Sequence, residues 1–176
     1  MTRRIRYQVA ASLDGYIAGP DGEFDWIPHD PEVDFEKLFE QFDTFLMGRG
    51  TLETMVKQQG SGAIPGKRVI VFSRTLRQEN HPEVTIVSEP SERFLNALRN
   101  EPGRDIWLFG GGSLFRSLLE VRGVDTIEVA IMPILLGGGI PILPAPAPRA
   151  KLKLRSHEVS KIGRVSVEYD IEYGGQ

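Results

Sequence analysis

The stretch "LFGGGSLF" at residues 108–115 places three consecutive glycines between two apolar runs. Glycine loses more conformational freedom on folding than any other residue, so such a run costs stability. Where a strand passes into a helix, glycines let backbone N–H groups approach a phosphate, and the helix N-terminus adds partial positive charge. The spacing is neither G-x-G-x-x-G nor that of a P-loop. A phosphate cradle and a tight turn that needs positive φ are both open.

Two arginines follow other short apolar runs, Arg49 in "MGRGT" and Arg74 in "SRT". The planar guanidinium fork suits phosphate oxygens. Taken singly, each arginine is also explained as a solvated surface residue. Two arginines with neighbouring serines and threonines at successive strand ends, taken with the glycines, instead suggest a dinucleotide with an extra 2′-phosphate. That phosphate distinguishes NADPH from NADH.

Metal and thiol chemistry find no support in the sequence. The chain has no cysteine, which excludes disulfides, thiolate metal sites and cysteine nucleophiles. The three histidines are scattered and follow no ligand spacing. We therefore predict no metal site.

The elements that must position these residues alternate between strands and helices. Period-two or continuous apolar patterns predict strands, and apolar residues spaced by three and four predict helices. We expect strands at 5–12, 44–48, 68–73, 84–88, 105–110, 126–136, 153–160 and 165–173, and helices at 30–42, 51–58, 91–99 and 113–120.

Two helix starts are predicted from capping residues. Asp30 before Pro31 fits an N-cap followed by proline at the first helical position. The apolar stripe of this helix is formed by Phe35, Leu38, Phe39 and Phe42. Thr51 is the expected cap of the following helix.

Alternating strands and helices imply parallel connections, and continuous apolar strands suit a sheet covered on both faces. The last two strands alternate in polarity and are joined near Gly163, which predicts an antiparallel pair. We expect one α/β domain over residues 1–176, with three layers and a mixed, mostly parallel sheet of about eight strands that ends in an antiparallel C-terminal edge.

Composition narrows the function classes. The formal charge of −3 argues against nucleic-acid binding, which needs basic surface. No apolar run approaches the roughly 20 residues of a membrane span. The N-terminal residues lack the apolar stretch of a signal peptide and alternate like a strand. We expect a cytoplasmic enzyme or binding domain.

Five motifs occur in a familiar order: "VAASLDGYIA", "LMGRGTLETM", "VIVFSRT", "LFGGGSLF" and "PILLGGGIPIL". In this order the chain resembles the dihydrofolate reductase-like superfamily over essentially its whole length. Its motifs are most similar to the reductase domain of the riboflavin-biosynthesis deaminase/reductase. The zinc-binding deaminase half of that protein has no counterpart here.

The resemblance implies NADPH as the hydride donor and assigns residues to it. Ala10 and the Ile17–Ala18 segment would flank the nicotinamide. The phosphates would be held by Gly48, Arg49, Gly50 and Thr51, and the 2′-phosphate end by Ser73 and Arg74. The pyrophosphate would lie against Gly110, Gly111, Gly112, Ser113 and Leu114.

The substrate side is assigned from the same resemblance. Dihydrofolate reductases keep an acidic residue on the first helix after a tryptophan-containing loop, and "DWIPHD" supplies Trp26 here. Glu32 and Asp34 both lie beside the apolar stripe and either could face a cleft; Asp34 is the expected catalytic acid, with a solvated acid as the alternative. Asp14 and Trp26 are expected to contact substrate, although an Asp-Gly turn and a buried loop anchor explain them as well.

Two classes of function follow. The first is an NADPH-dependent reductase of a pyrimidine or pteridine-like heterocycle, with reduction of 5-amino-6-(5-phosphoribosylamino)uracil ahead of folate reduction. That uracil carries a phosphate, yet no basic cluster stands out in the first 45 residues beyond Arg3, Arg4 and Arg6. The second is a non-catalytic nucleotide-binding module. The apolar segment "PILLGGGIPILP" and the resemblance both predict a homodimer.

Overall fold

The computed structural model describes residues 2–174. Its strands are β1 (Ile5–Ser12), β2 (Tyr16–Ala18), β3 (Phe42–Gly48), β4 (Arg68–Phe72), β5 (Thr85–Val87), β6 (Asp105–Gly110), β7 (Thr126–Met132), β8 (Ile140–Pro141), β9 (Lys151–Val159) and β10 (Val165–Glu172). Its helices are α1 (Phe35–Glu40), α2 (Arg49–Gln59), α3 (Glu92–Asn100) and α4 (Gly112–Glu120), with a 3-10 turn at Gln78–Asn80.

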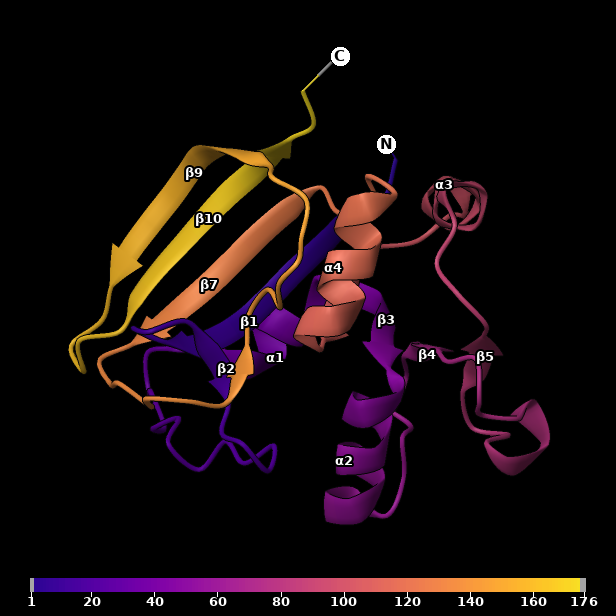
Figure 1. The fold of residues 1–176 in the computed structure, drawn as a ribbon, viewed down its shortest axis with the longest axis horizontal. Helices are drawn as coiled ribbons and strands as arrows, with labels where there is room; N and C mark the ends of the chain where they lie inside the picture. The colour runs from indigo at the N-terminus through magenta and orange to yellow at the C-terminus, as the bar shows by residue number, and fades with distance from the viewer. Residues whose placement is uncertain (1, 175–176) are drawn as a thin grey trace.

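Eight strands form one sheet in the order β5-β4-β3-β6-β1-β7-β10-β9. Every pairing from β5 to β7 is parallel, whereas β10 pairs antiparallel with both β7 and β9. In Figure 1, β9 and β10 form the outer edge at the left, beside β7. The predicted mixed sheet with an antiparallel C-terminal edge is confirmed.

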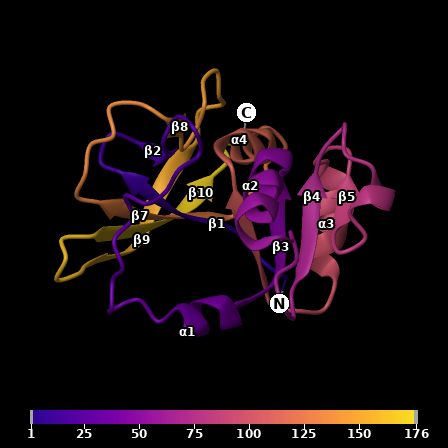
Figure 2. The ribbon, with the colours of Figure 1, turned by 90° about the horizontal axis from the view of Figure 1, so that it is seen from below.

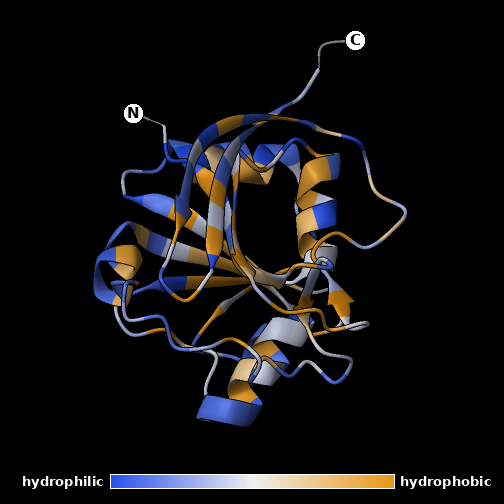
Figure 3. Cartoon of the chain, turned by 90° about the vertical axis from the view of Figure 1, so that its left-hand side faces the viewer, coloured by the Kyte–Doolittle hydropathy of each residue, from blue (hydrophilic) through white to orange (hydrophobic). Residues whose placement is uncertain are grey.

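Helices cover both faces of the parallel part of this sheet. The side chains of α3 and α4 pack with Ile5, Tyr7 and Leu46 on one face. On the other face, α2 and the flanks of α1 pack around Phe45 and Trp107. Hydropathy colouring shows hydrophobic residues on the inner strands and hydrophilic residues at the outer helix ends (Figure 3). Burial on both faces explains the continuous apolar strands, and the three-layer prediction is confirmed.

The predicted start of the first helix is wrong. The helix begins at Phe35, and Asp34 is its N-cap, accepting a hydrogen bond from the Lys37 backbone N–H. Asp30 lies outside the helix, and its carboxylate is held by Arg164 in the turn between β9 and β10. Phe35 is exposed rather than part of a buried stripe.

The second helix also begins before its predicted cap. It starts at Arg49, and its N-cap is Gly48, which offers no side-chain cap. Thr51 therefore lies inside the first turn. The consequence is a helix N-terminus whose N–H groups are left to the solvent or a ligand.

One edge of the sheet collects the ends that could bind a ligand. β3 runs into α2 and β6 runs into α4, so two helix N-termini lie at the carboxyl ends of neighbouring strands. The short β2–β8 pair lies together beside this edge, apart from the main sheet (Figure 2). Open α/β sheets bind ligands at such an edge.

Candidate active site

A cavity of about 1790 Å³ opens at this edge. It is bounded by the carboxyl ends of β1, β3, β4 and β6, by the N-terminal turns of α2 and α4, and by the segment that connects β2 to α1. It continues over β7 and the β9–β10 hairpin. The cavity is therefore long enough to offer two differently lined ends.

The structure brings every predicted cofactor residue to the wall of this cavity. The motifs that carry them are distant in sequence, but parallel strands place their carboxyl ends at one edge. The residues are Ala10, Ile17, Ala18, Gly48, Arg49, Gly50, Thr51, Ser73, Arg74, Gly110, Gly111, Gly112, Ser113 and Leu114.

The three consecutive glycines have three different surroundings. Gly110 ends β6 with φ +140°, a conformation that side chains rarely adopt. Gly111 is the N-cap of α4 at φ −94°, and a Cβ there would find only Thr51 Oγ1, at 3.9 Å. A Cβ on Gly112 would collide with the Pro141 carbonyl oxygen. Only Gly111 thus combines an ordinary φ with open space at the cavity wall.

The two predicted phosphate-binding arginines are exposed and loosely held. Arg49 donates to Thr75 Oγ1 at 3.2 Å, and its Nε lies 3.5 Å from a Glu53 carboxylate oxygen. The side chain of Arg74 is 81% exposed, and its nearest carboxylate oxygen is 3.9 Å away. Exposed pairs at these distances contribute little stability, so both guanidinium groups are available to an anion.

Ser73 is less available than predicted. It is buried, and its Oγ accepts hydrogen bonds from the backbone N–H groups of Thr75 and Leu76 at 3.2 and 3.1 Å. The hydroxyl also lies 3.4 Å from Thr75 Oγ1, so it shapes the turn that presents Arg74.

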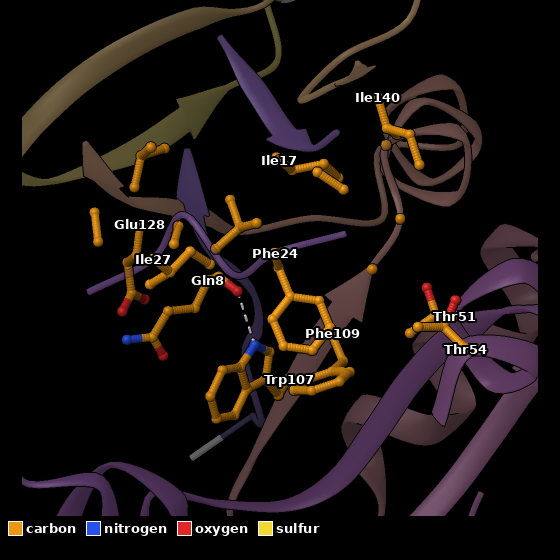
Figure 4. Close-up of a pocket in the computed structure, with 18 of the residues that line it drawn as sticks. Gln8, Ile17, Phe24, Ile27, Thr51, Thr54, Trp107, Phe109, Glu128 and Ile140 are labelled. Atoms are coloured by element: carbon orange, nitrogen blue, oxygen red, sulfur yellow. Dashed lines mark hydrogen bonds between the residues drawn. The ribbon is translucent and has the colours of Figure 1, made fainter. Parts of the chain in front are cut away.

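The opposite end of the cavity is lined by aromatic rings and polar side chains. Figure 4 shows Gln8 and Glu128 side by side at one end, Thr51 and Thr54 at the other, and the rings of Phe24, Phe109 and Trp107 between them. Trp107 Nε1 donates to the Gln8 carbonyl oxygen at 3.0 Å, which fixes the indole. Flat apolar faces beside fixed polar groups suit a planar heterocycle.

Glu128 was not predicted, because nothing in its local sequence sets it apart. It projects from β7, and Arg6 on the adjacent strand β1 donates to both of its oxygens, at 2.6 and 2.8 Å. Its neighbours on the cavity wall are set by strand pairing rather than by spacing along the chain.

Asp34 lines the cavity, but its surroundings are those of a capping residue. Its carboxylate is 48% exposed and lies 2.9 Å from Lys37 Nζ. This hydrogen bond and that from the Lys37 backbone lower the pKa of Asp34. Its role as the catalytic acid stays a prediction.

Asp14 and Trp26 do not line the cavity. The carboxylate of Asp14 accepts backbone hydrogen bonds from Leu136 and Gly137 at 3.1 and 2.7 Å. A hydrogen bond with Ser12, followed by that from Leu136, lowers the pKa of Asp14 to about 2. Trp26 Nε1 donates to the Glu23 carbonyl oxygen at 3.3 Å. Both groups therefore organise loops, and the structure does not bring them to the substrate end.

A buried ion pair holds the segment before α1 over the cavity. Arg164 Nε lies 2.7 Å from Asp30 Oδ2, and both side chains are almost fully buried. The hydrogen bond from Arg164 lowers the pKa of Asp30. Lys161 adds a backbone hydrogen bond to Glu32 at 3.0 Å. The partners are separated by 134 residues, so no sequence pattern could reveal this connection.

Two further properties concern the described residues alone. Residues 2–174 contain no group of three or more His, Asp or Glu side chains placed to hold a metal ion. No helix within the same range is long and apolar enough to cross a membrane.

Several known proteins are similar to this chain in sequence or in structure. YyaP of Bacillus subtilis, an uncharacterized protein, is 32% identical over 178 residues, which cover 95% of this chain and 94% of YyaP. A crystal structure from Shewanella sp. PV-4, named for riboflavin biosynthesis, has a TM-score of 0.80 at 28% identity and covers 98% of this chain and 100% of its own.

A dihydrofolate reductase from Enterococcus faecalis, complexed with NADP(H), has a TM-score of 0.69 at 16% identity and covers 98% of this chain and 100% of its own. This likeness establishes the dihydrofolate reductase-like fold that the motifs predicted. The family model of the RibD C-terminal domain matches residues 3–167. The chain therefore belongs to the RibD C-terminal domain family, an oxidoreductase family of riboflavin-biosynthesis type.

Proposed function

We propose that this protein is an NADPH-dependent reductase of a planar pyrimidine or pteridine-like heterocycle. The observation that carries the proposal is the single cavity in which all predicted cofactor residues meet an aromatic, polar wall. Membership of the RibD C-terminal domain family and the NADP(H)-bound protein of the same fold support it.

The residues present fit such a cofactor. A Cβ on Gly50 would meet nothing within 4 Å, and one on Gly111 only Thr51 Oγ1, so backbone N–H groups are approachable at both helix N-termini. Helix N-termini favour phosphate through these N–H groups and the helix dipole. Arg49 and Arg74 supply positive charge nearby. The pyrophosphate would lie against Gly111 and Gly50, and the 2′-phosphate against Arg74.

Bound NADPH would supply a hydride which, with one proton, reduces one C=N or C=O bond as NADPH becomes NADP⁺; the proton comes from solvent, with Asp34 as the predicted side chain that delivers it. The chain's own residues would position the cofactor and the heterocycle against each other and exclude water from them. Phe109 and an edge of the buried Trp107 indole line the cavity, and the segment fastened by Asp30 and Arg164 forms another part of its wall.

Titration with NADPH and NADH tests the cofactor assignment, and NADPH oxidation with candidate heterocycles tests turnover. We expect tighter binding of NADPH, and a loss of about tenfold or more in NADPH affinity in Arg74→Ala, because a charge-assisted hydrogen bond contributes roughly 1.5–3 kcal/mol. Arg93→Ala, an exposed arginine on α3 away from the cavity, is the matched control. Equal affinities for the two nucleotides would remove the 2′-phosphate assignment, and NADPH binding without any turnover would favour a non-catalytic nucleotide-binding module.

A further inference from the structure

Charged residues are distributed unevenly along the cavity. The end formed by α2, the β4 carboxyl end and the loop between β5 and α3 carries Arg49, Lys57 and Arg74, against Glu53 and Glu89. Its cations therefore outnumber its acids, in addition to the two helix N-termini. This end suits a ligand with several phosphates.

The end formed by the β2–α1 segment, β7 and the β9–β10 hairpin has the opposite balance. Its only lysine or arginine residues at the cavity wall are Lys37 and Arg164, within residues 2–174. The carboxylates along this end are Asp21, Asp30, Glu32, Asp34, Glu128, Glu158 and Glu168. Three of them are paired with cations outside the cavity wall: Glu32 with Lys161, Glu128 with Arg6 and Glu168 with Arg155. A dianionic group placed here meets like charges on several sides.

Both cations are already paired with carboxylates at 2.7 to 2.9 Å, although the side chain of Lys37 is 81% exposed. Arg164 donates from Nε to Asp30 at 2.7 Å, from Nη2 to Glu158 at 3.0 Å, and from Nη1 to Ser166 Oγ. Its side chain is only 6% exposed. These bonds use three of the five N–H donors of a guanidinium, and burial leaves little room at the other two, so a phosphate would compete with Asp30 and Glu158 for Arg164. Lys37 is paired with the cap of its own helix.

The wall offers hydrogen-bond acceptors instead. Glu128 is held by Arg6, and a carboxylate has more acceptor sites than the two that Arg6 uses. Gln8 Oε1 is buried and has no hydrogen-bond partner among the described residues. Both side chains lie beside the indole of Trp107 in Figure 4. Acceptors at the edge of a flat apolar face complement a planar ring that carries N–H donors.

We propose that this end of the cavity binds an uncharged or cationic planar heterocycle with ring N–H donors and no phosphate ester. The inference rests on the proposed function only in taking the cation-rich end for the cofactor. It separates this chain from enzymes that reduce a phosphoribosyl substrate, because such an ester needs a free cation where this chain has acids.

The test uses a pair of ligands that differ by one phosphate: 5-amino-6-ribosylaminouracil and its 5′-phosphate. Calorimetric titration of the purified chain without nucleotide measures the binding of each. We expect the unphosphorylated ligand to bind at least about tenfold more tightly, since several carboxylates face the position of the ester. Raising the salt concentration should narrow the difference by screening these charges.

Removing one carboxylate at this end tests whether charge causes the expected preference. Glu158 is 66% exposed, so Glu158→Gln should leave the fold intact while it releases Arg164 Nη2 from a carboxylate. We expect affinity for the phosphate ester to rise about fivefold and affinity for the unphosphorylated ligand to stay the same. Glu120→Gln on α4 removes an equal charge away from this cavity and should change neither.

Equal or tighter binding of the phosphate ester by the parent chain, or binding of neither ligand, would overturn the inference. The proposed function fails separately. If the unphosphorylated ligand binds with the expected preference but NADPH does not bind or is never oxidised, the charge inference stands and the reductase assignment is wrong.

Discussion

The glycine run at 110–112 gives the sharpest test of the cofactor site, because two adjacent positions should respond in opposite ways. Gly111→Ala places a methyl group at φ −94° with no neighbour closer than 3.9 Å. Gly112→Ala drives a methyl group into the Pro141 carbonyl oxygen and to 3.0 Å from that of Ile142. We therefore expect Gly111→Ala to weaken cofactor binding and Gly112→Ala to destabilise the fold.

The expected changes in Tm follow from the surroundings of the two glycines. Overpacking against backbone costs typically about 1–3 kcal/mol, and a domain of this size loses roughly 2–4 °C in Tm per kcal/mol, so Gly112→Ala should lower Tm by about 2–12 °C. Alanine at an accessible φ gains about 0.4–1 kcal/mol from the unfolded state, which offsets the weaker N-cap. Gly111→Ala should therefore melt within about 2 °C of the parent.

The loss of NADPH affinity should follow the reverse order and be larger for Gly111→Ala than for Gly112→Ala. The Gly111 methyl group would stand where a pyrophosphate oxygen approaches the N-terminus of α4, and one lost charge-assisted hydrogen bond corresponds to about tenfold or more in affinity. Differential scanning fluorimetry and NADPH titration on the same preparation measure both quantities. If Gly111→Ala binds NADPH as well as the parent, the phosphate lies elsewhere; if it unfolds, the turn is structural and the reasoning is wrong.

The remaining predictions concern the segment before α1 that Asp30 fastens, the predicted acid Asp34 and the oligomeric state. Asp30→Asn should lower Tm at neutral pH. Because the folded-state pKa of Asp30 is depressed, its contribution is present above the unfolded pKa of about 4 and is lost as pH falls through the folded value, so melting curves of parent and variant should converge in acid. Asp34→Asn should lower turnover and leave KM for NADPH unchanged if this residue is the acid; unchanged turnover in steady-state assays would assign it to helix capping alone. We expect a homodimer, so light scattering should give about twice 19.7 kDa, and a particle of 19.7 kDa at micromolar concentration would contradict this. Leu154 is 53% exposed on the edge strand β9, and Leu154→Lys should yield the monomer if that edge contributes to the interface.

The meeting of Arg49, Arg74 and Gly111 at one cavity wall was predictable from sequence because its determinants are local. Each of Arg49, Arg74 and Gly111 sits where an apolar strand ends, and parallel strands must bring such ends to one edge. The sequence also determined the succession of helices and main-sheet strands along the chain and the antiparallel C-terminal edge, but not the short strands β2 and β8, since period and polarity are set by neighbouring residues.

The substrate end was decided by tertiary structure. Asp30 had the local signature of a helix cap, yet the buried guanidinium of Arg164, in the β9–β10 turn, outweighs a cap that water can satisfy. Glu128 reached the cavity wall through the pairing of β7 with β1, which also gave it Arg6 as a partner. Which charges are free and which are already neutralised depends on partners far apart in sequence, and this balance is what distinguishes one end of the cavity from the other.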